Sequence, residues 1–212
     1  MNNYQIQRNK LKLYINKVLY SSLIPLLSKM KISPNTLTII GFIFSLITMI
    51  LISQGYLLIS GILIIFSSVF DLLDGALARY TGNTTNFGKF FDAVIDRLSE
   101  MAIYIGLFLY FMNDTNSLLI IFISTISNQL VSYIKTKYES IGIEGDIGVF
   151  TRPERIITLS LALIIGSFYL YIFYIFMYIS ILLALISIMQ RIFYGFINSD
   201  KKWKKPLYLY HF

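Results

Sequence analysis

Residues 71–97 read DLLDGALARYTGNTTNFGKFFDAVIDR, and this stretch decides how the rest of the chain is arranged. It contains four aspartates in two pairs: Asp71 and Asp74, then Asp92 and Asp96. Because an α-helix turns by about 100° per residue, spacings of three and four residues place each pair on one helix face. We therefore expect two helices that turn carboxylates toward a shared pocket.

Carboxylates this close together repel one another and lose hydration unless cations neutralise them. Oxygen ligands without His or Cys favour Mg²⁺, Mn²⁺ or Ca²⁺ over zinc. The usual alternative for acids at this spacing is a solvated helix face. The flanking sequence argues against it, because residues 32–70 carry no charge and the whole chain has only 11 acidic residues. Acids beside such an apolar segment are costly in a membrane, so we interpret the stretch as a metal site.

The composition is that of a membrane protein. Of the 212 residues, 56% are hydrophobic and 14% are charged, and the mean hydropathy is +0.68. The length allows one domain, and the lack of cysteine excludes disulfides and thiolate metal sites. A net charge of +7 next to apolar segments is typical of anchors at an anionic lipid surface. We therefore expect membrane lipids, and no nucleic acid, as partners.

Apolar segments separated by polar turns predict an all-α integral membrane fold with six transmembrane helices in residues 36–198. The expected spans cover about 36–53, 56–79, 88–112, 118–138 and two halves of 156–190 that divide near 166–171. Residues 1–35 mix basic and apolar side chains, which predicts an interfacial amphipathic helix, and residues 199–212 form a basic C-terminal tail.

The distribution of charge predicts the orientation of these spans. With six crossings, all 18 Lys and Arg residues lie on or near one side of the membrane, together with the aspartates. The positive-inside rule places that side in the cytoplasm. We expect a multi-pass protein of the cell membrane whose active site faces the cytoplasm.

The fixed positions of the stretch form the pattern D-x2-D-G-x2-A-R-x8-G-x3-D-x3-D. This pattern resembles the signature of the CDP-alcohol phosphatidyltransferases at all eight positions. The resemblance implies an enzyme that uses two Mg²⁺ or Mn²⁺ ions, in which an alcohol attacks the lipid-side phosphorus of a CDP-linked lipid and CMP leaves. It also implies three principal metal ligands, Asp71, Asp74 and Asp92. Asp96 would be the general base and a further ligand.

The same resemblance implies a set of contacts with the CDP-linked lipid: Asn35, Asp74, Gly75, Ala78, Arg79 and Gly88. Taken alone, the small residues also suit close helix packing, and the arginine also suits snorkelling at the interface. Upstream, residues 34–38 resemble the P-N-x-x-T found before the first span of many family members. Arg97 and Glu100, one turn beyond Asp96, are expected to form a supporting ion pair.

Four basic residues stand at the expected cytoplasmic ends of spans four to six: Lys135, Arg152, Arg155 and Arg191. On charge alone, separate positive-inside anchors are the favoured explanation. However, residues 133–135, 142–148 and 152–155 resemble one subgroup of the family, the phosphatidylinositol phosphate synthases and their archaeal archaetidylinositol phosphate counterparts. This resemblance implies that the four residues bind the phosphate of inositol 1-phosphate, and that the protein is a homodimer.

Two alternatives stay open at this point. Within the family, glycerol 3-phosphate is the alternative acceptor. Outside it, charged residues in a polytopic protein also mark cation transporters, although transporters usually place them near the bilayer midplane rather than at one interface. The sequence leaves open whether the lipid chains are ester-linked or ether-linked.

Overall fold

The computed structural model describes residues 23–143, 145 and 147–203, and every regular element in them is a helix. After the short helix α2 (Ile24–Lys29), six longer helices follow: α3 (Pro34–Ser53), α4 (Leu57–Tyr80), α5 (Asn86–Tyr110), α6 (Thr115–Ser140), α7 (Arg152–Gly166) and α8 (Leu170–Trp203). The predicted all-α class is confirmed.

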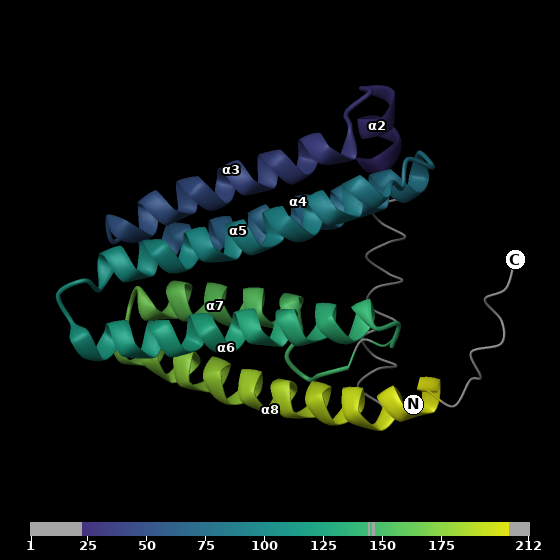
Figure 1. The fold of residues 1–212 in the computed structure, drawn as a ribbon. Helices are drawn as coiled ribbons and strands as arrows, with labels where there is room; N and C mark the ends of the chain where they lie inside the picture. Colours follow the sequence, from purple (N-terminus) through teal and green to yellow (C-terminus); the bar gives the residue numbers. More distant parts are fainter. Residues whose placement is uncertain (1–22, 144, 146, 204–212) are drawn as a thin grey trace, which may run out of the picture.

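The six long helices run side by side in two groups (Figure 1). One group contains α3, α4 and α5, and the other contains α6, α7 and α8. Helix α3 packs against both α4 and α5, and the two groups are joined mainly where α4 packs on α7, with a smaller contact between α5 and α6. The two helices that carry the aspartates therefore flank α3 rather than forming the main packing partners of each other.

Local sequence explains where the helices begin and turn. At the start of α3, Pro34 occupies the first turn, and the Ser33 hydroxyl accepts a hydrogen bond from the Thr36 amide at 3.2 Å. Between α3 and α4, Gly55 adopts a φ of +87°, which a residue with a side chain rarely does. The predicted division near residues 166–171 is also confirmed, because α7 ends at Gly166 and α8 begins at Leu170.

One close helix crossing fixes the distance between α3 and α5. A Cβ atom added at Gly106 would lie 2.7 Å from the Met49 carbonyl oxygen and 3.0 Å from the Met49 Cα. Only glycine allows the two backbones to approach this closely. The crossing holds α5 against α3 along its length, and so it also sets the position of the aspartates at the other end of α5.

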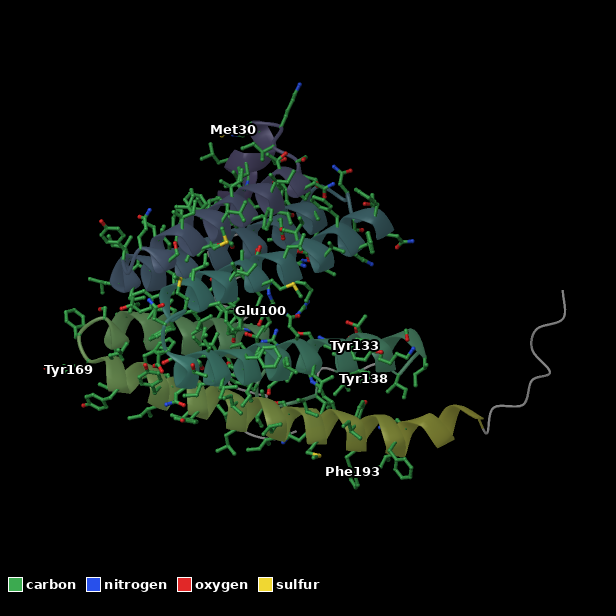
Figure 2. All side chains as sticks on the ribbon, turned by 60° about the vertical axis from the view of Figure 1, so that its left-hand side comes forward. Met30, Glu100, Tyr133, Tyr138, Tyr169 and Phe193 are labelled. Atoms are coloured by element: carbon green, nitrogen blue, oxygen red, sulfur yellow. The ribbon has the colours of Figure 1, made fainter. Side chains whose placement is uncertain are left out.

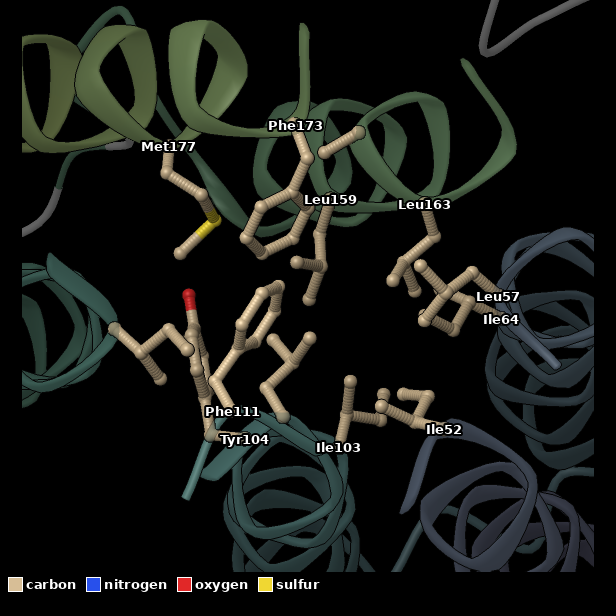
Figure 3. Close-up of a cluster of buried hydrophobic side chains, with 13 residues drawn as sticks. Ile52, Leu57, Ile64, Ile103, Tyr104, Phe111, Leu159, Leu163, Phe173 and Met177 are labelled. Atoms are coloured by element: carbon tan, nitrogen blue, oxygen red, sulfur yellow. The ribbon is translucent and has the colours of Figure 1, made fainter. Parts of the chain in front are cut away.

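The largest apolar core fills the half of the bundle remote from residues 71–97. All six long helices, α3 to α8, contribute buried side chains to it (Figure 3). Phe111 and Phe173 are stacked there with ring centroids 5.2 Å apart, and Leu163 and Met177 are buried beside them. Most of the buried apolar packing therefore lies away from the motif, and a smaller apolar cluster joins α2, α3 and α4 beside it.

Within the described residues, four helices are long and apolar enough to cross a membrane: α3, α4, α6 and the part of α8 from Leu170 to Asn198. Charged residues interrupt α5, and α7 has only 15 residues, fewer than the ~20 that span a bilayer. The helices are those of a membrane protein, and the count of six crossings stays a prediction. Most of the predicted interfacial segment 1–35 and of the tail 199–212 lies outside the described residues.

Candidate metal and phosphate site

A cavity of about 400 Å³ lies at the polar end of the bundle. Its walls come from the first turns of α3, the last turns of α4, the loop that follows α4 and the start of α5. All six residues predicted to contact a CDP-linked lipid line it: Asn35, Asp74, Gly75, Ala78, Arg79 and Gly88. The size is within the range of small-molecule sites, about 300–1,000 Å³. The motif residues therefore gather on one concave surface.

Two of the four aspartates, Asp74 and Asp92, line this larger cavity. Asp74 is only 4% exposed and its Oδ2 accepts a hydrogen bond of 2.6 Å from the hydroxyl of Thr38, which is 3% exposed. The buried hydroxyl, which comes from α3, fixes the orientation of the carboxylate on α4. Thr38 is the last residue of the P-N-x-x-T resemblance, but the sequence did not indicate that it pairs with Asp74.

The other two aspartates are joined by an arginine from the first turn of α7. Arg152 Nη2 donates a hydrogen bond of 2.7 Å to Asp71 Oδ2 and lies 2.6 Å from Asp96 Oδ1. The second contact is an ion pair without hydrogen-bond geometry, and Asp96 Oδ1 is a buried oxygen with no hydrogen-bond partner. Arg152, predicted to bind the acceptor phosphate, thus lies between two predicted metal ligands.

A second, much smaller cavity of about 40 Å³ adjoins this contact. It is lined by Asp71, Asp96, Glu100, Arg152 and Arg155, together with serine and apolar side chains of α3, α4, α5 and α7. This volume accommodates water but no sugar phosphate. The four aspartates are therefore divided, with one from each predicted pair on each cavity.

The donor set can be compared with what a metal requires. As the side chains stand, the described residues contain no group of three Asp, Glu, His or Cys side chains that could hold an ion. The aspartates nevertheless supply only oxygen donors, which suits Mg²⁺ or Mn²⁺. The Oδ1 of Asp96 is buried without a hydrogen bond, and the guanidinium of Arg152 lies between the carboxylates of Asp71 and Asp96, where it supplies positive charge. In kind, the residues fit a hard divalent ion.

Two of the predicted phosphate-binding arginines are buried and held by their own chain. Arg155 Nη1 donates to the Asn128 carbonyl at 3.1 Å, Nη2 donates to the Ser132 hydroxyl at 2.9 Å, and Nε lies 3.2 Å from Glu100 Oε1. Arg155 is 5% exposed. Its guanidinium therefore ties α7 to both α5 and α6.

Arg191, which is 2% exposed, plays the same part on α8: it donates to the carbonyls of Ile147, at 2.8 Å, and Val131. Lys135 is the most open of the four predicted residues, with a side chain 35% exposed and 3.8 Å from Glu139. The structure brings Arg152 and Arg155 to the small cavity, whereas Lys135 and Arg191 do not line it.

The sequence and the fold of this chain are similar to those of known proteins. The family model described as CDP-alcohol phosphatidyltransferase matches residues 31–186. The chain belongs to the CDP-alcohol phosphatidyltransferase family. This family member is 36% identical over 135 residues to the phosphatidylinositol phosphate synthase of Mycobacterium marinum, which covers 62% of this chain and 58% of that protein. The match thus spans less than two thirds of the mycobacterial relative.

A second relative of this phosphatidyltransferase family member is covered more fully. The archaetidylinositol phosphate synthase of Pyrococcus horikoshii is 35% identical over 172 residues, or 79% of this chain and 85% of that protein. Among solved structures, the phosphatidylinositol phosphate synthase of Mycobacterium tuberculosis with CDP-DAG bound has a TM-score of 0.76 and 29% identity, over 82% of this chain and 92% of that chain. The same protein in complex with manganese and citrate has a TM-score of 0.76 and 28% identity, over 82% and 87%.

Sequence reasoning missed part of the charge pattern in this family member. The predicted pair of Arg97 and Glu100 is present at 3.6 Å, but Glu100 also faces Arg155. Figure 2 shows Glu100 between the two groups of helices. The signal was available, because Asp92, Asp96 and Glu100 follow one another at four-residue intervals along one face of α5.

Proposed function

We propose that this chain transfers a phosphatidyl or archaetidyl group from a CDP-linked lipid to inositol 1-phosphate and releases CMP. One observation carries the proposal: six motif residues from three separate segments line one cavity together with Asp92. The names of the relatives, phosphatidylinositol phosphate synthase and archaetidylinositol phosphate synthase, support the choice of acceptor.

Two Mg²⁺ or Mn²⁺ ions would be held by the four aspartates: Asp71, Asp74, Asp92 and Asp96. When bound, such ions neutralise the diphosphate and stabilise the charge on the departing CMP. The oxygen-only donor set and the manganese in the Mycobacterium tuberculosis structure support this assignment. Thr38 keeps the Asp74 carboxylate oriented toward the cavity from the side of α3.

The walls of the larger cavity are suited to the nucleotide. Gly75 and Ala78 have no large side chain on this face of α4, so a planar base can lie against the helix backbone. Arg79, at the end of α4, supplies a guanidinium for phosphate or cytidine oxygens. Asn35 lies beside Gly88, since a Cβ at that glycine would be 3.7 Å from Asn35 Oδ1. A side chain at Gly88 would therefore reduce the space at the start of α5.

Asp96 is the group that we assign to proton transfer. Its carboxylate is buried, and its Oδ1 has no hydrogen-bond partner besides the ion pair with Arg152, so this oxygen is the one we assign to accept the proton. The acceptor hydroxyl oxygen forms a bond to the lipid-side phosphorus while its proton passes to Asp96. The bond from this phosphorus to the diphosphate bridging oxygen breaks, and CMP leaves with that oxygen.

The acceptor phosphate would be bound by cations on α6, α7 and α8. Lys135 and Arg152 have partly exposed side chains, 35% and 26%, and we assign them the direct contacts. Arg155 and Arg191 are pinned by their own chain, so their charge acts from the wall of the site.

In the membrane, we propose that α5 and α7 cross together with the four apolar helices. Their charged side chains can be accommodated because they face one another, as Asp96 and Arg152 do. The polar end would then face the cytoplasm in a multi-pass protein of the cell membrane. The homodimer implied by the family resemblance completes this proposal.

The acceptor is tested by incubating purified protein with CDP-linked lipid, Mg²⁺ and one acceptor at a time, and measuring CMP. We expect CMP with inositol 1-phosphate. Faster release with glycerol 3-phosphate would assign the alternative acceptor. No CMP with any acceptor, from protein that moves cations across vesicles, would assign the transporter class.

The assignment of Asp96 is tested with Asp96→Asn, which keeps the shape and removes the base. We expect CMP release to fall by at least about 100-fold, which is within the usual contribution of general base catalysis. Binding of CDP-linked lipid should persist. Loss of binding, with normal turnover per bound site, would contradict this role.

A further inference from the structure

The contact of Arg152 with two aspartates has a feature that the proposed chemistry does not use. The same nitrogen, Nη2, lies 2.7 Å from Asp71 Oδ2 and 2.6 Å from Asp96 Oδ1. These carboxylates come from α4 and α5, and the arginine comes from α7. A single positive group therefore joins three helices at the place where divalent ions are expected.

The surroundings show why a cation is needed there. The side chains of Asp71 and Asp96 are only 19% and 12% exposed, so water compensates their charge incompletely. Uncompensated carboxylates at this depth would repel each other. When divalent ions bind to these carboxylates, they neutralise the negative charge that holds the guanidinium. The guanidinium and the ions then repel each other at short range, which disfavours the present position of Arg152.

The backbone beside Arg152 is held by bonds that do not involve the arginine side chain. Its residue lies in the first turn of α7, between the cap residue Thr151 and Pro153. The Thr151 amide donates to Glu154 Oε2 at 3.0 Å, and the Phe150 amide donates to the Ser187 hydroxyl at 2.8 Å. These bonds fix the backbone immediately before Arg152 without using its side chain, which is 26% exposed and therefore reaches solvent in part.

We propose that Arg152 is the resident counter-ion of the ion-free aspartate site, and that divalent ions displace its guanidinium toward the acceptor phosphate. The inference rests on the proposed function, because it requires that the aspartates bind metal. It gives the site an order of events. The ions bind first, and the arginine becomes available to the acceptor only as a result.

The test is a Mn²⁺ titration of detergent-solubilised protein without CDP-linked lipid, in which free Mn²⁺ is measured by electron paramagnetic resonance. Arg152→Met removes the competing cation and should bind Mn²⁺ about tenfold more tightly than the wild type, while the acceptor KM rises. Arg152→Lys keeps a positive charge and should bind Mn²⁺ within about threefold of the wild type. Lys89→Met is the control, because Lys89 lines the larger cavity with Asp92 but, among the described residues, pairs with none of the aspartates.

Each outcome has a distinct meaning. Tighter binding in Arg152→Met alone supports displacement. Equal or weaker binding in that variant overturns it, as does an equal gain in Lys89→Met, which would indicate a general effect of charge. If wild-type protein binds no Mn²⁺ even in the millimolar range, the metal site of the proposed function fails first. Should Arg152→Met unfold without ions, recovery of its fold by Mn²⁺ supports the inference, and failure to recover while Arg152→Lys binds normally overturns it.

Discussion

The hydroxyl of Thr38 provides a sharp test of the site, because one atom can be removed while the shape of the side chain is kept. Thr38→Val replaces the hydroxyl by a methyl group at a position that is 3% exposed. The change removes the 2.6 Å hydrogen bond to Asp74 Oδ2 and adds no bulk. We expect weaker binding of Mn²⁺ and of the CDP-linked lipid that depends on it.

The size of the effect follows from the geometry. A hydrogen bond to a charged group contributes about 1.5–3 kcal/mol, and Asp74 is buried enough that water cannot replace the lost donor fully. Since about 1.4 kcal/mol corresponds to a factor of ten, Mn²⁺ affinity should fall by about 10-fold to 100-fold. The same range is typical when a group that orients a metal ligand is removed.

The assay is the Mn²⁺ titration with matched variants on the same helix. Thr48→Val is the control, because Thr48 is also buried on α3 but its hydroxyl donates only to the Phe44 carbonyl, at 2.8 Å. Thr38→Ser keeps the hydroxyl and should recover most of the affinity. If Thr38→Val binds Mn²⁺ as the wild type does, or if Thr48→Val loses as much, then the hydroxyl does not position Asp74 for metal.

Two further predictions concern stability, measured by thermal unfolding in detergent. Gly106→Ala forces a Cβ against Met49 O and should cost about 1–3 kcal/mol, whereas Gly195→Ala, with its nearest neighbour 4.0 Å away, should cost less than about 1 kcal/mol. Equal costs would contradict the close crossing of α3 and α5. Glu100→Gln leaves the buried Arg155 without its counter-ion and should cost about 3 kcal/mol, and a variant as stable as the wild type would show that the pair is not needed.

Much of the fold could be predicted from hydropathy and from the polar turns between apolar segments, but the ends of two helices could not. Hydropathy predicts the last two spans within the uncharged stretch 156–190, because charged residues stand directly before and directly after it. The structure begins α7 at Arg152 and continues α8 to Trp203. Charge ends an apolar run without ending a helix, and the cap formed by Thr151 and Glu154 starts α7 among the charged residues.

Residue spacing alone predicted the site only where its residues share a helix. Spacing alone brings Asp71 to the side of Asp74, because three residues complete nearly one turn. It cannot show that Arg152, which is 81 positions away from Asp71, lies against it, since this depends on how α7 packs on α4. The resemblance to the family predicts that Arg152 binds a phosphate, whereas in the structure its partners are two aspartates.

The pairs between α5 and α7 show how one kind of chemistry can serve both the fold and the site. Asp96 and Glu100 are four residues apart, Arg152 and Arg155 are three apart, and the two helices join them as consecutive pairs. The guanidinium of Arg155, with a side chain 4% exposed, has three partners that hold it in place, whereas the side chain of Arg152 is 26% exposed. Burial therefore decides the role of each pair. In the deeper pair, Arg155 and Glu100, the arginine also donates hydrogen bonds to α6, and the pair holds the helices together. The outer pair, Arg152 and Asp96, can therefore separate when ions bind, because the helices stay joined without it.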